Sequence, residues 1–306
     1  MTTQRWANDL AQIVNPNNIK LNESLKKYTM TKLGGNADIF VLPETEEEAT
    51  AIVKYAHEQN IPILMLGNGS NMVVRDGGVR GIVICFQKLD EIRVDVNQIY
   101  AQSGALVINV SKLAAINGLT GFEFACGIPG SVGGAMAMNA GAYGGEIKDI
   151  IIDCTVLTKE GERIVLTKDE LELEYRKSII AKKEYFVLSS RFQLEQGIQE
   201  EIDAKIADLT FKRESKQPLE YPSAGSVFKR PPGYFAGKLI QDSGLQGKGV
   251  GDAEVSTKHA GFIINKGNAT ATDYIETIKM VQNVVKDKFG VELELEVKIV
   301  GEDLTT

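Results

Sequence analysis

The segment Leu66-Gly67-Asn68-Gly69-Ser70-Asn71 constrains the fold of this chain most strongly. It lies between two largely apolar runs, 61–65 and 72–75, which predicts a strand, a tight glycine loop and a second strand. Two glycines in three residues allow positive φ angles and let backbone N–H groups approach a ligand closely. Successive N–H groups that point into one concavity form an anion site suited to a pyrophosphate. Because Asn-Gly is also the strongest short-range signal for a β-hairpin, a plain hairpin turn is the alternative interpretation.

A second glycine-rich segment, residues 127–145, contains seven glycines. Its interleaved Ile, Val, Met and Tyr residues distinguish it from a flexible linker and place it inside a folded domain. A short helix beginning near Pro129 would present its N-terminal N–H groups to a phosphate. Two separate glycine loops suit a ligand with a long phosphate-bearing body, such as a dinucleotide. Neither loop is the G-x-G-x-x-G that opens a Rossmann helix, so a different way of holding a dinucleotide is expected.

Length and composition exclude several classes of protein. A chain of 306 residues predicts two or three domains, and a net charge of −7 argues against a general nucleic-acid-binding protein. The three cysteines lie among apolar or small residues, which predicts buried thiols, and their odd number and wide spacing argue against disulfides. Neither histidine has the spacing of a zinc ligand. We expect no metal. The N-terminal residues lack a signal sequence and no run of about 18 apolar residues occurs, so we expect a cytoplasmic protein with no membrane contact and no obligate protein partner.

The apolar pattern predicts a βαβ unit near the start of the chain. A strand at 39–42 is followed by a helix that Thr45 opens, with Glu48 completing a capping box, and then by a strand at 61–66. The two strands are expected to form a parallel pair. Further helices are expected near residues 7–14, 106–117, 130–138, 198–216, 234–242 and 272–289, and further strands near 156–158, 164–166, 187–192, 253–255, 261–265 and 293–300. The mixed charges of the helix at 198–216 indicate a solvated face.

Six motifs occur in a fixed order along the chain. They are GGNAD at 34–38, LGNGSN at 66–71, GIPGSVGG at 127–134, YRKS at 175–178, AGSVFK at 224–229 and LEVK at 295–298. In this combination the chain resembles the UDP-N-acetylenolpyruvoylglucosamine reductase family, the UDP-N-acetylmuramate dehydrogenases, over nearly all its length. The first three motifs alone indicate only the wider superfamily of FAD enzymes that share the same flavin-binding fold.

The resemblance implies an α+β chain with a two-domain FAD-binding fold of the PCMH/VAO type and a C-terminal α+β substrate-binding domain. The expected boundaries are 1–78 with a returning strand at 293–306, then 79–197, then 198–292. The longer form of the family carries a lid loop whose tyrosine covers the substrate. Here too few residues separate the strand at 186–194 from the helix near 198, which indicates the shorter form. Tyr143, Tyr221 and Tyr234 are candidates to cover the substrate instead.

The resemblance also implies the activity. The expected reaction is the NADPH-dependent reduction of UDP-N-acetylglucosamine enolpyruvate to UDP-N-acetylmuramate through FAD, a cytoplasmic step of peptidoglycan precursor synthesis. Because no histidine adjoins either glycine loop, FAD is expected to be bound non-covalently. The expected FAD contacts are Leu66, Gly67, Asn68, Gly69, Ser70, Asn71, Gly127, Ser131, Gly133, Gly134, Asn139 and Gly141.

Three residues are candidates for catalysis by resemblance. Ser226 would protonate the substrate carbon; it does not lie in a G-x-S-x-G motif, and the pattern alone indicates a turn residue. Arg176 would polarise the enolpyruvyl carboxylate, a role suited to a planar guanidinium that keeps its charge. Glu296 would stabilise the enol-like intermediate, although the alternation of 293–299 by itself places Glu294, Glu296 and Lys298 on one exposed face.

Lys216, Lys229, Arg230 and Tyr143 are the candidate substrate-binding residues, and His259 has no assigned role. Two rival functions follow from the same residues. One is a flavin oxidase or dehydrogenase of the same superfamily with another substrate, against which the motifs at 175–178 and 225–229 argue. The other is a sugar-nucleotide-binding module without redox activity, which would be colourless even after FAD is added.

Overall fold

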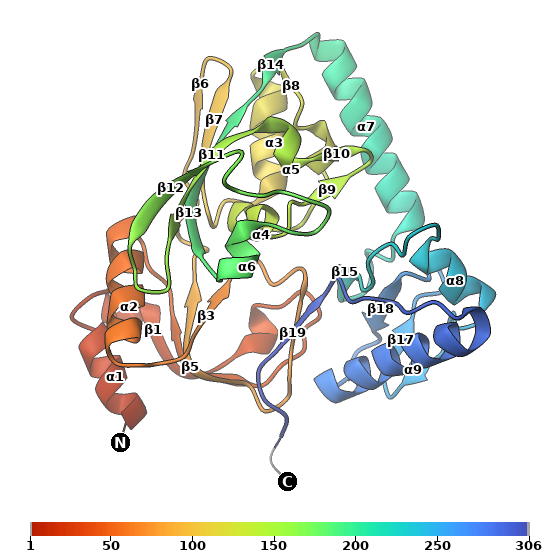
Figure 1. Ribbon diagram of the computed structural model, residues 1–306, viewed down its shortest axis with the longest axis horizontal. Coiled ribbons are helices and arrows are strands. Elements are labelled where there is room, and N and C mark those ends of the chain that lie inside the picture. Colours follow the sequence, from red (N-terminus) through yellow and green to blue (C-terminus); the bar gives the residue numbers. More distant parts are fainter. Residues whose placement is uncertain (1, 305–306) are drawn as a thin grey trace. The chain divides into compact units, whose positions relative to one another are not determined.

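The computed structural model describes residues 2–304, which form two compact units (Figure 1). Unit 1 comprises Met1–Leu21, Asp38–Asn68 and Gly81–Arg213, and unit 2 comprises Asn22–Ala37, Gly69–Arg80 and Glu214–Thr306. Residues 1, 305 and 306, at the ends of the first expected domain, lie outside the described residues. The three-domain boundaries expected from the sequence stay a prediction.

Helices are interspersed with single strands and runs of strands along the chain. The helices are α1 Thr2–Leu10, α2 Glu46–Glu58, α3 Val107–Ile116, α4 Val132–Ala137, α5 Ile147–Ile150, α6 Ile179–Lys183, α7 Gln199–Lys216, α8 Ala236–Asp242 and α9 Ala271–Phe289. The strands are β1 Ile19–Ser24, β2 Asn36–Val41, β3 Ile63–Leu66, β4 Met72–Val74, β5 Val79–Cys85, β6 Ile92–Asp95, β7 Gln98–Gln102, β8 Leu119–Thr120, β9 Gly141–Ala142, β10 Gly145–Glu146, β11 Ile151–Leu157, β12 Arg163–Thr167, β13 Phe186–Gln193, β14 Glu195–Gln196, β15 Ser223–Ser226, β16 Gly249–Val250, β17 Ala253–Val255, β18 Phe262–Asn265 and β19 Lys298–Val300.

The first sheet has the order β1-β2-β5-β3, with β3 parallel to β5. The expected parallel pairing of β2 with β3 is therefore wrong, because β5 lies between them. The reason is burial: residues 81–85 of β5 are all buried, and a near-continuous apolar strand belongs in the middle of a sheet.

Helix α2 connects β2 to β3, and its N-terminal cap follows the sequence prediction closely. The Oγ1 of Thr45 accepts a hydrogen bond from the N–H of Glu48 at 3.1 Å. The carboxylate of Glu48 accepts from the N–H of Glu44 at 2.6 Å, one residue earlier than in a standard capping box. The predicted apolar face, Ala49, Ile52, Val53 and Ala56, is fully buried.

The second sheet of unit 1 is antiparallel, with the order β12-β11-β13-β7-β6. The predicted hairpin of β11 and β12 is confirmed. Helices α3 and α4 pack against this sheet, and residues of both helices share one hydrophobic core with β7, β11 and β13 (Figure 1). This packing places the segment that precedes α4 beside the glycine loop that follows β3.

The three cysteines are buried free thiols, as predicted from their neighbours and their spacing. Burial raises the pKa of Cys85 to about 11 and that of Cys154 to about 12. Both thiols are therefore protonated near neutral pH and act as small apolar side chains.

Unit 2 contains a four-stranded sheet with the order β15-β18-β17-β16, against which α9 packs. Tyr274 of α9 is fully buried, and its hydroxyl donates to the carbonyl of Ile263 at 3.0 Å. Strand β19 pairs in parallel with β4. The strand expected at 293–300 is shorter than predicted, because only residues 298–300 join β4, while Leu295 forms an isolated bridge with Phe228.

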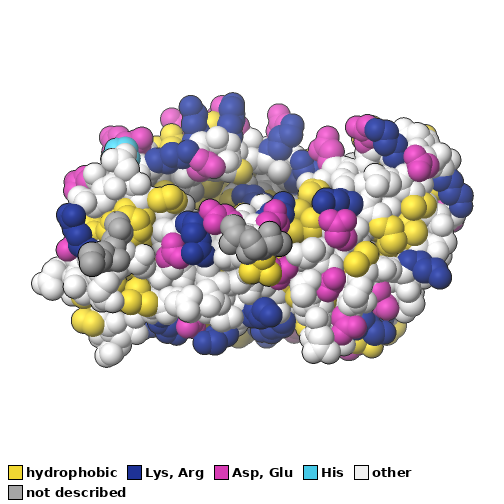
Figure 2. Space-filling view, turned by 90° about the horizontal axis from the view of Figure 1, so that it is seen from below, with side chains coloured by type: hydrophobic (Ala, Val, Ile, Leu, Met, Phe, Trp, Pro, Cys, Tyr) yellow, Lys and Arg dark blue, Asp and Glu magenta, His cyan; other side chains and the backbone are white. Residues whose placement is uncertain are grey.

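On the face shown in Figure 2, Lys and Arg side chains lie among Asp and Glu side chains. Many of the described cations form ion pairs, such as Lys279 with Glu276 at 2.8 Å. In residues 2–304, no helix combines the length and the apolar character needed to cross a membrane.

Candidate functional site

The two glycine loops lie against each other in unit 1. The side-chain Nδ2 of Asn68 donates to the carbonyl of Pro129 at 2.6 Å. A Cβ atom added to Gly67 would lie 2.4 Å from the Oγ of Ser131, closer than real Cβ atoms come. Position 67 must therefore be glycine, because the two loops are in contact there.

The hairpin interpretation of the first loop is wrong. Strand β3, before the loop, pairs with β5, and strand β4, after it, pairs with β19. Gly69 has a φ of +58°, is buried, and lies so close to the chain at Tyr28 that an added Cβ would come within 2.1 Å of the Tyr28 carbonyl oxygen. The glycines of this loop thus allow close backbone approach, not a hairpin turn.

The loop leaves a row of backbone N–H groups unpaired. Among the described residues, the N–H groups of Gly67, Asn68, Gly69 and Ser70 have no hydrogen-bond acceptor. Gly69 is buried and the other three residues are partly buried. Because buried N–H groups are almost always paired, a row of successive N–H groups without a protein acceptor fits an anionic ligand. This observation satisfies the structural requirement for a phosphate-bearing cofactor such as FAD at residues 67–70.

In the second loop, by contrast, backbone N–H groups donate hydrogen bonds to protein carbonyls. The N–H of Val132 donates to the carbonyl of Ala105 at 2.8 Å, and that of Gly133 donates to the carbonyl of Ser103 at 2.9 Å. Ser131 caps α4 by accepting from the N–H of Gly134 at 3.4 Å. The expectation that this helix presents its first N–H groups to a phosphate is thus wrong for Val132 and Gly133. Contacts of Gly133 and Gly134 with a cofactor stay a prediction that no longer rests on the helix end.

Arg213, near the end of α7, covers the beginning of the second loop. A Cβ on Gly127 would lie 2.5 Å from its Cδ and 3.2 Å from its Nε. The sequence analysis missed this residue because it assigned the charges of this helix to a solvated face. A signal was present: Arg213 follows the buried Leu209 by four residues and so shares its face of the helix.

Asn139 is fully buried, and its side-chain amide bonds to protein groups on every side. Its Nδ2 donates to the Glu146 carboxylate at 2.6 Å and to the Glu174 carbonyl at 3.1 Å, and its Oδ1 accepts from the N–H of Lys148 at 2.9 Å. These bonds favour a positioning role for Asn139, which ties the segment after α4 to the turn that carries Arg176.

Tyr143 lies at the tip of the small hairpin β9–β10. Tyr143 and Gly144 have φ angles of +54° and +91°, and Ala142 pairs with Gly145 across them. Positive φ at both central residues is the signature of a type I′ turn, which holds the half-exposed Tyr143 ring outward. The strand pair is tight at Gly141, where a Cβ would lie 2.7 Å from the Gly145 carbonyl oxygen.

Arg176 is held in a strained turn. Its φ is +56°, a conformation that costs a non-glycine residue on the order of 1–3 kcal/mol. Its Nη2 donates to the carbonyl of Gly141 at 3.4 Å, and its Cζ lies 4.9 Å from the centre of the Tyr175 ring. Such strain persists only where the surrounding bonds enforce it, which agrees with a turn built to present the guanidinium.

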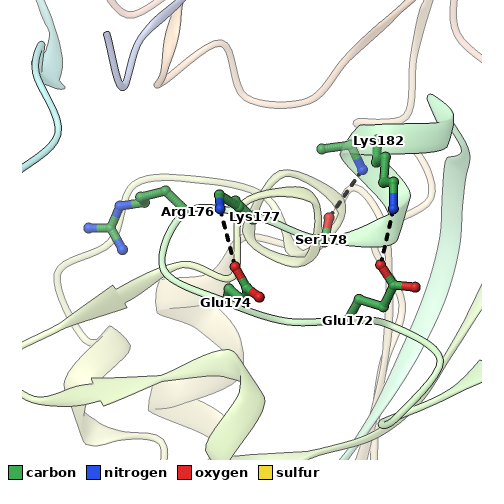
Figure 3. A pocket seen from close by; sticks show the side chains of 7 residues that line it. Glu172, Glu174, Arg176, Lys177, Ser178 and Lys182 are labelled. Carbon is green, nitrogen blue, oxygen red and sulfur yellow. Dashed lines mark hydrogen bonds and ion pairs between the residues drawn. The ribbon is translucent and has the colours of Figure 1, made fainter. Parts of the chain in front are cut away.

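Residues of this turn line a surface pocket (Figure 3). The volume of the pocket is about 540 Å³. Its charged side chains are largely paired, Lys177 with Glu174 at 3.2 Å and Lys182 with Glu172 at 3.5 Å. Ser178 donates to the carbonyl of Ala137 at 2.6 Å and caps α6, so its hydroxyl is structural. The Arg176 side chain points away from both ion pairs (Figure 3).

In unit 2, Ser226 and Glu296 come together on neighbouring segments. The N–H of Glu296 donates to the carbonyl of Val227 at 2.8 Å, and the N–H of Lys229 donates to the carbonyl of Glu294 at 2.9 Å. Gly225, directly before the serine, has a φ of +73° and open space around it. This positive φ bends the end of β15 and sets the direction in which Ser226 leaves the strand.

Glu296 does not share the exposure of its neighbours on the alternating segment. Glu294 and Lys298 are exposed, whereas Glu296 is half-buried. The side-chain Nδ2 of Asn71 donates to the Glu296 carbonyl at 3.1 Å, which anchors the segment to the first glycine loop. The interpretation of one uniformly exposed face is therefore wrong at Glu296.

The candidate substrate-binding cations of unit 2 differ in their surroundings. Lys229 pairs with the exposed Glu294 at 3.2 Å, whereas the Cζ of Arg230 lies 4.5 Å from the centre of the Phe235 ring. Lys216 is exposed at the end of α7. Tyr221 and Tyr234 are partly exposed, at 37% and 49%.

His259 is half-buried beside Phe262, and burial lowers the pKa of its imidazole. Its Nδ1 accepts from the N–H of Gly261 at 3.1 Å, so the neutral ring carries its proton on Nε2.

Comparisons with known proteins agree with the resemblance seen in the motifs. A family model described as "UDP-N-acetylenolpyruvoylglucosamine reductase, C-terminal domain" matches residues 217–300, and a "FAD binding domain" model matches residues 37–167. The UDP-N-acetylenolpyruvoylglucosamine reductase of Exiguobacterium sibiricum is 56% identical over 303 residues, which cover 99% of this chain and 100% of the relative. The UDP-N-acetylenolpyruvoylglucosamine reductase of Geobacillus thermodenitrificans is 59% identical over 294 residues, which cover 96% of this chain and 97% of the relative.

Solved structures give the same result. The crystal structure of UDP-N-acetylenolpyruvylglucosamine reductase (MurB) from Thermus caldophilus superposes with a TM-score of 0.78 at 36% identity, covering 92% of this chain and 97% of that one. An alkyldihydroxyacetonephosphate synthase superposes with a TM-score of 0.50 at 18% identity over 63% of this chain and 40% of that one, which indicates a shared fold alone. The chain thus has an FAD-binding fold followed by a reductase-type C-terminal domain, as predicted.

Proposed function

Since the chain belongs to the UDP-N-acetylenolpyruvoylglucosamine reductase family, we propose that it reduces UDP-N-acetylglucosamine enolpyruvate to UDP-N-acetylmuramate with NADPH through bound FAD. This step would supply peptidoglycan precursors in the cytoplasm. The observation that carries the proposal is the identity of 56% over 99% of the chain and 100% of a named reductase. The chain matches the shorter form, because only residues 194–198 separate β13 from α7 and leave no room for a lid loop.

FAD, when bound, supplies the hydride chemistry, accepting a hydride from NADPH and delivering one to the vinyl carbon of the substrate. The chain's part is to bind and orient. The unpaired N–H groups of Gly67–Ser70 would hold the FAD pyrophosphate. No histidine lies in either loop, which supports non-covalent binding.

Ser226 is the proposed proton donor to the substrate carbon next to the carboxylate. A serine hydroxyl is a weak acid, so it must be held within about 3 Å of that carbon as charge develops there. The positive φ of Gly225 and the backbone bond between Val227 and Glu296 restrict the segment that carries it. A fixed segment limits the loss of conformational entropy on reaching the reactive geometry.

Arg176 and Glu296 are proposed to face the enolpyruvyl carboxylate. Negative charge spreads into that carboxylate as the hydride arrives, and a guanidinium stabilises it by paired hydrogen bonds. Glu296 is half-buried and would lie beside the same developing charge. In its protonated form, Glu296 would donate a hydrogen bond to that charge and stabilise it.

Lys216, Lys229 and Arg230 are proposed to bind the sugar-nucleotide diphosphate. Lys229 pairs with the exposed Glu294, an ion pair that contributes at most about 1 kcal/mol in water. A diphosphate carries more charge than one carboxylate and would displace Glu294. Tyr143, Tyr221 and Tyr234 stay candidates to cover the substrate.

The test separates the two half-reactions in the variant Ser226→Ala. Reduction of the flavin by NADPH needs no proton from this serine and should stay near normal under anaerobic conditions. Reoxidation by the enolpyruvyl substrate should slow by ~10²–10⁴, the effect of losing a positioned general acid. Stopped-flow absorbance of the flavin measures both steps. Equal reoxidation rates in wild type and variant would remove Ser226 from the mechanism.

A simpler measurement tests the cofactor. The purified protein should be yellow, and denaturation should release all flavin into the supernatant. A protein that stays colourless after addition of FAD would favour the sugar-nucleotide-binding module. Flavin that precipitates with the chain would contradict non-covalent binding.

A further inference from the structure

Arg213 differs from the arginines of the described chain that form ion pairs. Arg75, Arg163 and Arg191 each pair with a carboxylate, Asp303, Glu46 and Asp153 respectively. Within residues 2–304, no carboxylate lies at ion-pair distance from Arg213, and no acceptor receives its hydrogen bonds. Its guanidinium is nevertheless half-buried, and burial lowers its pKa.

The neighbouring helix residues explain why Arg213 has no partner. The carboxylate of Asp208 lies one turn back on α7 but pairs with Lys212 at 2.6 Å. Tyr143 lies near the guanidinium, and burial raises the pKa of its hydroxyl, so it supplies no negative charge near neutral pH. A half-buried cation without a carboxylate partner is unfavourable unless an anion joins it.

The position of Arg213 indicates which anion would join it. Its side chain packs on Gly127, and two residues further Pro129 accepts the hydrogen bond from Asn68. Two residues of extended chain span at most about 7 Å. The second glycine loop therefore packs against the Arg213 side chain at Gly127 and against the side chain of Asn68, a residue of the first glycine loop, at Pro129.

We propose that Arg213 binds a phosphate group of a nucleotide held along residues 127–131, with FAD as the favoured source. This inference rests on the proposed function and adds a binding residue outside the segment that matches the FAD-binding family model. A guanidinium suits the role because its planar fork donates two parallel hydrogen bonds to phosphate oxygens. The sugar-nucleotide diphosphate carries the same chemistry and is the alternative source.

The experiment compares Arg213→Gln and Arg213→Lys with the matched control Lys212→Gln. Lys212 is the next residue on α7, is exposed and already has Asp208 as partner. Flavin-free protein of each variant is titrated with FAD at low and high salt, and the unfolding midpoint of the flavin-free protein is measured. The Michaelis constant for the enolpyruvyl substrate is measured on the reconstituted enzymes.

For Arg213→Gln we expect the dissociation constant for FAD to rise about 10- to 100-fold, the loss of a charged hydrogen-bonded contact. The salt dependence of FAD binding should become shallower, because one charge contact is gone. Arg213→Lys should keep part of the affinity, and Lys212→Gln should match wild type. Flavin-free Arg213→Gln should be at least as stable as wild type, because it loses an unpaired buried charge.

A normal FAD affinity with a raised Michaelis constant for the substrate in Arg213→Gln would also support phosphate binding and assign it to the sugar nucleotide. If FAD affinity, its salt dependence and the Michaelis constant are all unchanged in Arg213→Gln, the proposal is overturned. If the unfolding midpoint of that variant is lowered as well, the role of Arg213 is in packing. Wild-type protein that binds no FAD would instead contradict the proposed function.

Discussion

Residues 67–70 and residues 131–134 are both rich in glycine, but their backbone N–H groups differ in whether they have hydrogen-bond acceptors. In the first segment, the four N–H groups have no acceptor among the described residues. In the second, the N–H groups of Val132 and Gly133 donate to the carbonyls of Ala105 and Ser103. The first segment holds its N–H groups available for a ligand, and the second uses them to attach α4 to the connection between β7 and α3.

A glycine motif therefore predicts that the backbone comes close to another group, but not whether that group is a ligand or another part of the protein. Gly67 and Gly133 each leave no room for a side chain, with added Cβ atoms at 2.4 Å and 2.1 Å from the hydroxyls of Ser131 and Ser103. In both cases the close partner is another part of the protein. A ligand site is indicated only where N–H groups stay unpaired after this packing.

The largest expected effect is protection of the first segment by FAD. At an FAD concentration of 1,000 times its dissociation constant, exchange through global unfolding should slow by about 10³-fold. The amides of Gly67–Ser70 should change from fast to slow exchange, whereas Val132 and Gly133 should already be protected without FAD. Hydrogen exchange with mass spectrometry measures this. If FAD slowed amide exchange equally in residues 67–70 and in Val132 and Gly133, the two segments would not differ in the availability of their N–H groups.

The next effect is on Gly69, whose replacement by alanine should destabilise the flavin-free protein. A left-handed φ costs alanine about 1–2 kcal/mol, and the clash with the Tyr28 carbonyl oxygen adds about 1–3 kcal/mol. Gly144→Ala is the control, because Gly144 has a φ of +91° and open space. Urea unfolding compares the two variants. A loss in Gly69→Ala no larger than in Gly144→Ala would show that the close approach is absent.

A smaller effect tests the contact between the two loops. Gly67→Ala should be destabilising because its Cβ meets the Ser131 hydroxyl, and it should cost less in a Ser131→Ala background. Ser131→Ala alone loses a helix cap, about 1 kcal/mol. The coupling in this double-mutant cycle should be about 0.5–3 kcal/mol. Strict additivity would mean that the loops do not touch at this point.

The smallest effect concerns Gly134, where an added Cβ would lie an ordinary 3.6 Å from the Ser131 Oγ. Because this position is in a helix, Gly134→Ala should stabilise the flavin-free protein by at most about 1 kcal/mol. If Gly134 lies against FAD, the same variant should bind FAD more weakly. Titration of the flavin-free variant decides this, and wild-type affinity would exclude Gly134 from the cofactor site.

The sequence by itself determined the local features of this protein. Thr45 and Glu48 predicted the start of α2, because a cap is a bond between residues three apart. The hairpin of β11 and β12, helices α3, α7 and α9, and the free cysteines follow from patterns within short windows. The ordered motifs identified the FAD-binding and reductase-type domains, because each motif holds residue types that its chemistry requires.

Only the tertiary structure decided which strands pair with each other and which side chains contact each other. The pairing of β3 with β5 and of β4 with β19 joins segments that are far apart in the sequence, so no short window of residues reveals it. Glu296 is half-buried, and the side chain of Asn71, 225 positions away, donates to its carbonyl; neither fact can be read from the segment 293–299 alone. Arg213 looks like one more surface charge in the sequence. Its lack of an ion-pair partner among the described residues is visible only in three dimensions, because whether a charge or an N–H group is paired depends on every group that packs around it.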